Sequence, residues 1–172
     1  MPSHQPVRWC LAPQSGRLSP QFTHVSVDDF RVVYDSITGG KRVTTGRLVP
    51  FCLFTDPEFA RVGLSEKEAK AQGIAYRLFK IPMEAVMRAS TLAETRGFLK
   101  ALVETGGDRI LGFTGLGVGA GEVLSSVQIA MVAGLPYTAL RDAMLTHPTL
   151  VEGLIPLFSS VPSVPKSAAA NS

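Results

Sequence analysis

The residues best suited to chemistry are His147 and Glu152, five positions apart near the C-terminal end of a 172-residue chain. A carboxylate that accepts a hydrogen bond from one imidazole nitrogen fixes the tautomer and the orientation of the ring. The other nitrogen can then exchange a proton with a substrate or a thiol near neutral pH. We therefore predict His147 and Glu152 as catalytic residues, with His147 as the acid and base and Glu152 as the group that orients it.

The same residues also have a purely structural interpretation. Thr149 and Glu152 have the Thr-x-x-Glu spacing of a capping box, in which the glutamate accepts a hydrogen bond from a backbone N–H at the start of a helix. Pro148 suits a position near the start of that helix. In this interpretation Glu152 only caps the helix and His147 is a loop residue. The sequence suggests no serine or cysteine nucleophile nearby, so a catalytic pair needs a third group from another chain.

Residues 115–120 form a second candidate site, because their GxGxxA spacing matches a dinucleotide-binding fingerprint. That fingerprint requires a parallel strand after the helix and an acidic residue about 20 positions further on. Asp142 has this spacing but lies in a helical stretch, and Glu122 would repel phosphates. We interpret the stretch as a tight strand-to-helix turn with close packing. A small nucleotide-binding protein that uses this turn remains an alternative.

Composition and cysteine usage exclude several other classes. The 17 basic and 14 acidic residues are scattered, so we expect no nucleic-acid partner. The most apolar stretch, residues 110–140, contains several glycines and Pro136, so we expect a buried strand and helix and no membrane partner. Cys10 and Cys52 are too far apart in sequence for a CxxC or CxxxxC pair. Two lone cysteines and no visible secretory signal favour a reducing compartment, which we take to be the cytoplasm.

The elements that must position these residues follow from periodicity and capping signals. Predicted strands cover residues 48–54, 75–81, 97–104 and 109–116, and predicted helices cover residues 22–37, 65–72, 120–133, 136–143 and 148–158. The last two strands form a hairpin around a loop with two glycines. Consecutive strands joined by tight turns predict an α+β fold, with an antiparallel sheet of about four to five strands covered by helices.

Several short motifs occur in a specific order along the chain. They are Thr55-Asp56-Pro57-Glu58, Val62-Gly63, Ser65-Glu66, Gly112, Gly117, Ala120-Gly121-Glu122, His147-Pro148-Thr149 and Glu152. Together they resemble the C-terminal dimerisation domain of the pyridine nucleotide–disulphide oxidoreductases, the family of glutathione reductase, lipoamide dehydrogenase and mercuric reductase. The resemblance covers about residues 20–158. It is closest to the mercuric reductase-like branch.

The resemblance implies a flavoprotein homodimer that uses FAD and NAD(P) in its complete form. It implies that His147 and Glu152 reach the flavin and the redox disulphide of the partner subunit, where His147 is the acid and base for thiol–disulphide exchange. It also implies that Phe22, Thr23 and His24, at a helix start, contact the flavin together with His147 and Pro148.

The chain departs from the family pattern in important ways. The family's N-terminal GxGxxG motif, its redox CxxxxC motif, its nicotinamide domain and the Gly-Asp before Thr23 do not occur in this sequence. We therefore expect a fragment that is inactive alone and binds neither FAD nor NAD(P). The alternative is a component of a split flavoenzyme that a separate flavin- and nicotinamide-binding chain completes. The sequence leaves open whether the chain is an enzyme.

The resemblance also predicts how the chain is divided. We expect residues 1–20 to be poorly ordered and residues 21–44 to be the end of a flavin-domain-like segment with its linker. Residues 45–158 would be the dimerisation domain, and residues 159–172 a disordered tail.

Overall fold

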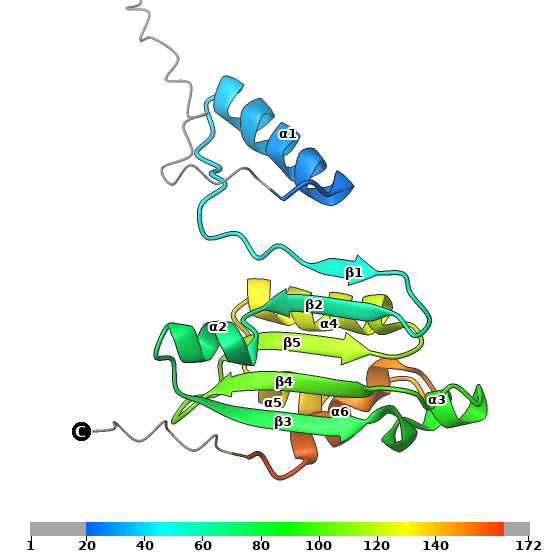
Figure 1. The fold of residues 1–172 in the computed structure, drawn as a ribbon. Helices are drawn as coiled ribbons and strands as arrows, with labels where there is room; N and C mark the ends of the chain where they lie inside the picture. Colours follow the sequence, from blue (N-terminus) through cyan, green and yellow to red (C-terminus); the bar gives the residue numbers. More distant parts are fainter. Residues whose placement is uncertain (1–19, 164–172) are drawn as a thin grey trace, which may run out of the picture. The chain divides into compact units, whose positions relative to one another are not determined.

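The structure is a computed structural model that describes residues 20–163 and divides into two units between Arg47 and Leu48 (Figure 1). The first unit contains helix α1 (Thr23–Ile37) and the segment after it. The second contains a sheet with its helices. Our expectations for residues 1–19 and 164–172 lie outside the described residues.

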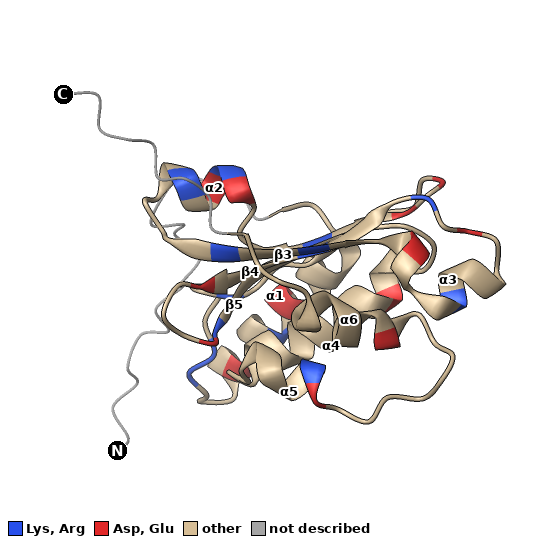
Figure 2. Cartoon of the chain, turned by 90° about the horizontal axis from the view of Figure 1, so that it is seen from below, with Lys and Arg blue, Asp and Glu red and all other residues tan. Residues whose placement is uncertain are grey.

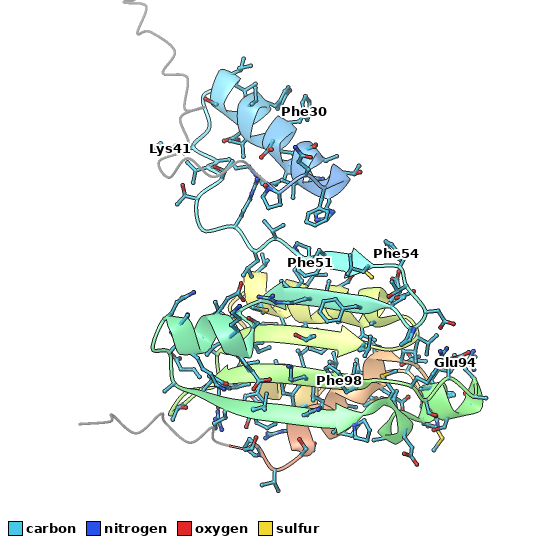
Figure 3. The ribbon with its side chains drawn as sticks, in the orientation of Figure 1. Phe30, Lys41, Phe51, Phe54, Glu94 and Phe98 are labelled. Carbon is cyan, nitrogen blue, oxygen red and sulfur yellow. The ribbon has the colours of Figure 1, made fainter. Side chains whose placement is uncertain are left out.

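Helix α1 confirms the helix predicted over residues 22–37. It ends at Ile37, and Gly39 follows with the left-handed φ of +87° that glycine adopts easily. Arg47 binds back to the helix, with Nη1 at 3.0 Å from an oxygen of Asp28 and 2.6 Å from an oxygen of Asp29. The first unit is therefore a helix with its following segment held against it by ion pairs. Phe30 of α1 is exposed (Figure 3).

The second unit is built on five antiparallel strands in the order β1-β2-β5-β4-β3. The strands are β1 (Phe51–Leu53), β2 (Phe59–Gly63), β3 (Tyr76–Pro82), β4 (Phe98–Glu104) and β5 (Ile110–Leu116). Strands β4 and β5 form the predicted hairpin. The α+β fold with an antiparallel sheet is therefore confirmed.

Strand β2 was missed by the sequence prediction, although it lies between β1 and β5. Its residues FARVG combine a charged side chain with a terminal glycine, which hides a short strand. Ala60 and Val62 are nevertheless buried, as the period-two alternation of a strand requires. The run predicted over residues 48–54 is also corrected, because only Phe51–Leu53 pairs as a strand.

Helices cover mainly one face of the sheet. They are α2 (Glu66–Ala71), the 3-10 helix η1 (Met83–Ala85), α3 (Met87–Thr91), α4 (Ala120–Val132), α5 (Tyr137–Arg141), the 3-10 helix η2 (Val151–Gly153) and α6 (Leu154–Ser159). The capping box predicted at the start of α2 is present. Helices α4, α5 and α6 pack on the side where the largest core residues lie, and they carry few charges (Figure 2). Phe79, Tyr137 and Phe158 form an aromatic cluster there, with ring centroids 5.3–5.8 Å apart.

The helix predicted over residues 148–158 is wrong as one continuous element. It is divided into η2 and α6, and residues 148–150 are not helical. Pro156 accounts for the interruption between η2 and α6, because it has no N–H to donate to the carbonyl of Glu152 in a regular α-helix.

The end of the described chain differs from the predicted disordered tail. Ser159 is the last residue of α6, and Ser163 exchanges two backbone hydrogen bonds of 2.8 and 2.9 Å with Leu78 of β3. Residues 159–163 are therefore part of the second unit.

Candidate active site

The segment that carries His147 joins α5 to η2 and is held by two glycines. A Cβ atom added to Gly119, whose φ is +62°, would lie 2.5 Å from Cδ1 of Leu150. A Cβ atom on Gly153 would lie 2.8 Å from a methyl group of Val86 and 3.0 Å from one of Leu99. Any side chain at these two positions would push against the segment or its support, so the glycines let it sit directly on the core.

His147 and Glu152 are in direct contact. Nδ1 of His147 lies 2.9 Å from Oε1 and 3.1 Å from Oε2 of Glu152. Because an ionised carboxylate only accepts hydrogen bonds, it requires the ring hydrogen on Nδ1 and leaves Nε2 as the exchangeable position. The His147 side chain is 67% exposed, whereas that of Glu152 is 18% exposed. The pair is thus an anchored carboxylate that holds an imidazole projecting into solvent.

Thr149 completes the surroundings of Glu152. Its backbone N–H donates to Oε2 of Glu152 at 3.0 Å, and the backbone N–H of Glu152 donates to Oγ1 of Thr149 at 3.4 Å. The N–H of Thr149 is the main cause that lowers the pKa of Glu152, and the hydrogen bond from His147 adds to it. The capping box and the contact with His147 therefore coexist on one carboxylate. The two interpretations of the sequence do not exclude each other, and the catalytic role stays a prediction.

The glycine-rich turn at residues 115–120 is filled by side chains. A Cβ atom on Gly117 would meet Met83 atoms at 2.7–3.0 Å, and Gly119 is covered by Leu150. Strand β5 has antiparallel neighbours, and α5 follows α4 where a dinucleotide-binding fold needs a parallel strand. The interpretation as a close-packed turn is supported, and the basis for the nucleotide-binding alternative is lost. Sequence reasoning missed that this turn supports the His147 segment.

The remaining predicted site residues lie in different places. Phe22, Thr23 and His24 are at the start of α1 in the first unit, where the rings of Phe22 and His24 stack with centroids 5.3 Å apart. Pro148 follows His147 in the second unit through a cis peptide bond. Cys52 is half-buried on β1, and burial is the main cause that raises the pKa of its thiol, with Glu58 and Glu122 adding to the effect. Cys10 lies outside the described residues.

A family model described as the dimerisation domain of pyridine nucleotide-disulphide oxidoreductases matches residues 49–156. The probable pyridine nucleotide-disulfide oxidoreductase RclA of Escherichia coli (strain K12) is 41% identical over 155 residues, covering 89% of this chain and 35% of that protein. Human mitochondrial dihydrolipoyl dehydrogenase is 35% identical over 133 residues, covering 77% of this chain and 26% of that enzyme. The chain thus spans about a third or less of the length of these relatives.

Solved structures give the same result. The HOCl-induced flavoprotein disulfide reductase RclA from Escherichia coli superposes with a TM-score of 0.79 at 42% identity, over 83% of this chain and 33% of that one. LpdA from Mycobacterium tuberculosis superposes with a TM-score of 0.74 at 22% identity, over 81% of this chain and 30% of that one, which supports the fold alone.

Proposed function

The chain belongs to the pyridine nucleotide–disulphide oxidoreductase family, and we propose that its second unit is a dimerisation domain whose His147 and Glu152 serve the flavin and dithiol site of a second subunit. The observation that carries this proposal is the anchored carboxylate beneath an exposed imidazole. Glu152 fixes hydrogen on Nδ1, so Nε2 can take the proton of an attacking thiol and return it to the leaving sulphur. The described residues around His147 offer no thiol, which is why the proposed target lies on another subunit.

Self-association is the part of this proposal that can be tested without any cofactor. Ile129 and Val132 on α4 are 69% and 71% exposed, and Glu122 is the only charged residue of that helix. Exposed apolar surface with few charges marks an interaction site, and the commonest arrangement is a two-fold dimer. We propose that a second copy buries this side of the domain.

Light scattering at micromolar concentration tests the dimer. The natural chain should have twice the mass of the 18.4 kDa monomer, and Ile129→Glu should shift it toward the monomer. Val161→Glu is the matched control, since Val161 is 95% exposed but lies after α6. A monomer mass for the natural chain throughout would contradict the proposal.

Enzymes of this family depend on FAD and a nicotinamide nucleotide, and we propose that this chain alone does not hold either of them. The one glycine-rich turn that resembles a phosphate cradle is filled by Met83 and Leu150. We propose that Phe22, Thr23 and His24 contact the flavin in the assembled enzyme, since a helix N-terminus stabilises negative charge there. His147 and Pro148 would approach it from the partner. The chain alone is proposed to be inactive and free of cofactor.

A flavin spectrum in the purified chain would instead favour the second candidate, a split flavoenzyme completed by a separate flavin- and nicotinamide-binding chain.

Three further proposals rest on the sequence: the division at residues 44–45, the mercuric reductase-like branch and the cytoplasmic location. Mercuric ion offered as acceptor to an assembled enzyme tests the second of these. Between residues 20 and 163, none of the helices is both long and apolar enough to cross a bilayer.

A further inference from the structure

We propose that Thr149 is a positioning residue for the His147–Glu152 pair, acting through its hydroxyl group. Oγ1 of Thr149 donates to the backbone carbonyl of Thr146 at 2.7 Å and accepts from the backbone N–H of Glu152 at 3.4 Å. The first bond closes a loop around His147 and Pro148, and the second ties that loop to η2. The catalytic value of this arrangement rests on the proposed function, but the arrangement itself does not.

The hydroxyl matters because the loop has little else to hold it. The segment between α5 and η2 is mostly exposed, and Met144 is completely so. Within residues 20–163, no backbone N–H from residue 143 to residue 147 donates a hydrogen bond. The loop is fixed from one end by Leu150 packed on Gly119. The hydrogen bond from Thr149 to Thr146 also holds the exposed residues between them in place.

The effect reaches His147 through Glu152. The backbone N–H of Thr149 holds Oε2 of Glu152 at 3.0 Å, which leaves Oε1 at 2.9 Å from Nδ1 of His147. Direction and distance of that N–H depend on the turn that the Thr149 hydroxyl closes. If the turn relaxes, the carboxylate and the ring move independently, and Nδ1 loses its fixed acceptor. Nδ1–H is then no longer the favoured tautomer.

The tautomer of His147 in the full chain is therefore the direct readout. Imidazole ¹⁵N spectra of labelled protein, recorded above neutral pH, distinguish the Nδ1–H from the Nε2–H form. The natural chain should hold His147 mainly as Nδ1–H. Thr149→Val keeps the shape but removes the hydroxyl, and we expect the ratio of the two tautomers to change about five- to ten-fold, as for the loss of one hydrogen bond. Thr149→Ser keeps the hydroxyl and should retain the natural ratio.

Two further variants keep the test decisive. Glu152→Gln removes the carboxylate and should shift the tautomer at least as far as Thr149→Val. Thr149→Ala should reproduce the valine result, and it replaces that variant if valine disturbs folding. His24, in the first unit, is the internal reference and should not change.

An unchanged tautomer in Thr149→Val and Thr149→Ala, or an equal change in Thr149→Ser, would overturn the inference. The proposed function fails separately. If the tautomer shifts as expected but an assembled enzyme does not need His147, the positioning role stands and the catalytic role falls.

Discussion

Residues 20–163 contain two pairs of residues with the hydrogen bonds of a capping box, and the two pairs are used differently. In the first, Glu68 accepts from the N–H of Ser65 at 2.8 Å, and the N–H of Glu68 donates to the Ser65 hydroxyl at 3.1 Å. In the second, the same reciprocal bonds join Thr149 and Glu152 at 3.0 and 3.4 Å. The hydrogen-bond pattern is therefore the same in both places, although the first box opens the α-helix α2 and the second precedes the 3-10 helix η2.

The third partner of each glutamate makes the difference. Glu68 pairs with Arg61 of β2, which stays charged at every working pH, so the contact is structural. Glu152 pairs with His147, whose imidazole is a group that proteins use as an acid and a base. A capping box therefore becomes a candidate acid–base site only when its carboxylate also binds a side chain that can transfer a proton.

The two boxes also differ in their attachment to the core. The first opens the short helix α2, with charged residues of both signs (Figure 2). The second is followed at once by the buried Gly153, where an added Cβ atom would meet Val86 and Leu99. A fixed site needs this second kind of attachment, since a proton-transfer group must be held in place.

The largest difference should appear when the two following glycines are changed. Gly153→Ala places a methyl group against Val86 and should lower the free energy of unfolding by about 1–3 kcal/mol through overpacking. Gly73→Ala meets no neighbour, but its φ of +66° should cost about 1 kcal/mol through backbone strain. Urea denaturation measures both. A smaller loss for Gly153→Ala than for Gly73→Ala would show that the second box is not tightly attached.

Removing the charge from each glutamate should separate stability from chemistry. Glu68→Gln weakens the ion pair with Arg61 and should lower the free energy of unfolding by about 0.5–1 kcal/mol, with no effect on the His147 tautomer. Glu152→Gln should change that tautomer. Denaturation and imidazole ¹⁵N spectra of the same samples test both variants. A change of the His147 tautomer in Glu68→Gln would contradict the difference between the two boxes.

Acid should separate His147 from Glu152 only at low pH. The pKa of Glu152 is lowered by Thr149 and His147, so the carboxylate stays ionised below the ordinary value of 4.5. A depressed folded-state pKa contributes stability above the unfolded-state pKa, and this stability is lost as pH falls through the folded-state value. A carboxyl ¹³C titration should therefore have its midpoint below 4.5. A midpoint at or above that value would mean that the hydrogen bonds to Glu152 do not persist in solution.

The smallest effect is expected from exchanging the capping hydroxyl of the first box. Ser65→Thr retains the oxygen that accepts from Glu68 and should change the free energy of unfolding by less than about 0.5 kcal/mol. Thermal denaturation measures it. A loss above about 1 kcal/mol would indicate that the two boxes are less alike than their bonds suggest.

The sequence predicted those parts of the fold whose signals are local. Helix α2 has its own capping box, the β4–β5 hairpin has its glycine-containing loop, and α4 ends before Gly134. Strand β2 was missed because it is stabilised by pairing with β1 and β5, its two neighbours in the sheet. Strand β1 precedes it in the sequence, but β5 is far from it in the sequence. Short strands depend on such partners more than on their own residues.

The candidate site shows the same limit. The contact between His147 and Glu152 could be predicted from the sequence, because the two residues are only five positions apart. The support by Gly119 and Leu150 was not, because it joins the β5–α4 turn to a segment beyond α5. Gly117 and Gly119 resemble part of a phosphate-binding motif in the sequence. Only the three-dimensional structure shows that the side chains of Met83 and Leu150 fill the space beside them.

The most direct measurement of the central claim uses a chimera in which the second unit of this chain replaces the matching part of the Escherichia coli relative. Reduction of the flavin by nicotinamide and disulphide-dependent turnover are measured separately, with Glu68→Gln as the matched control. His147→Gln should slow disulphide-dependent turnover by roughly 10²–10⁴-fold, as for the loss of a general acid and base, while flavin reduction changes little. Unchanged turnover, or an equal loss in both steps, would contradict an acid–base role for His147.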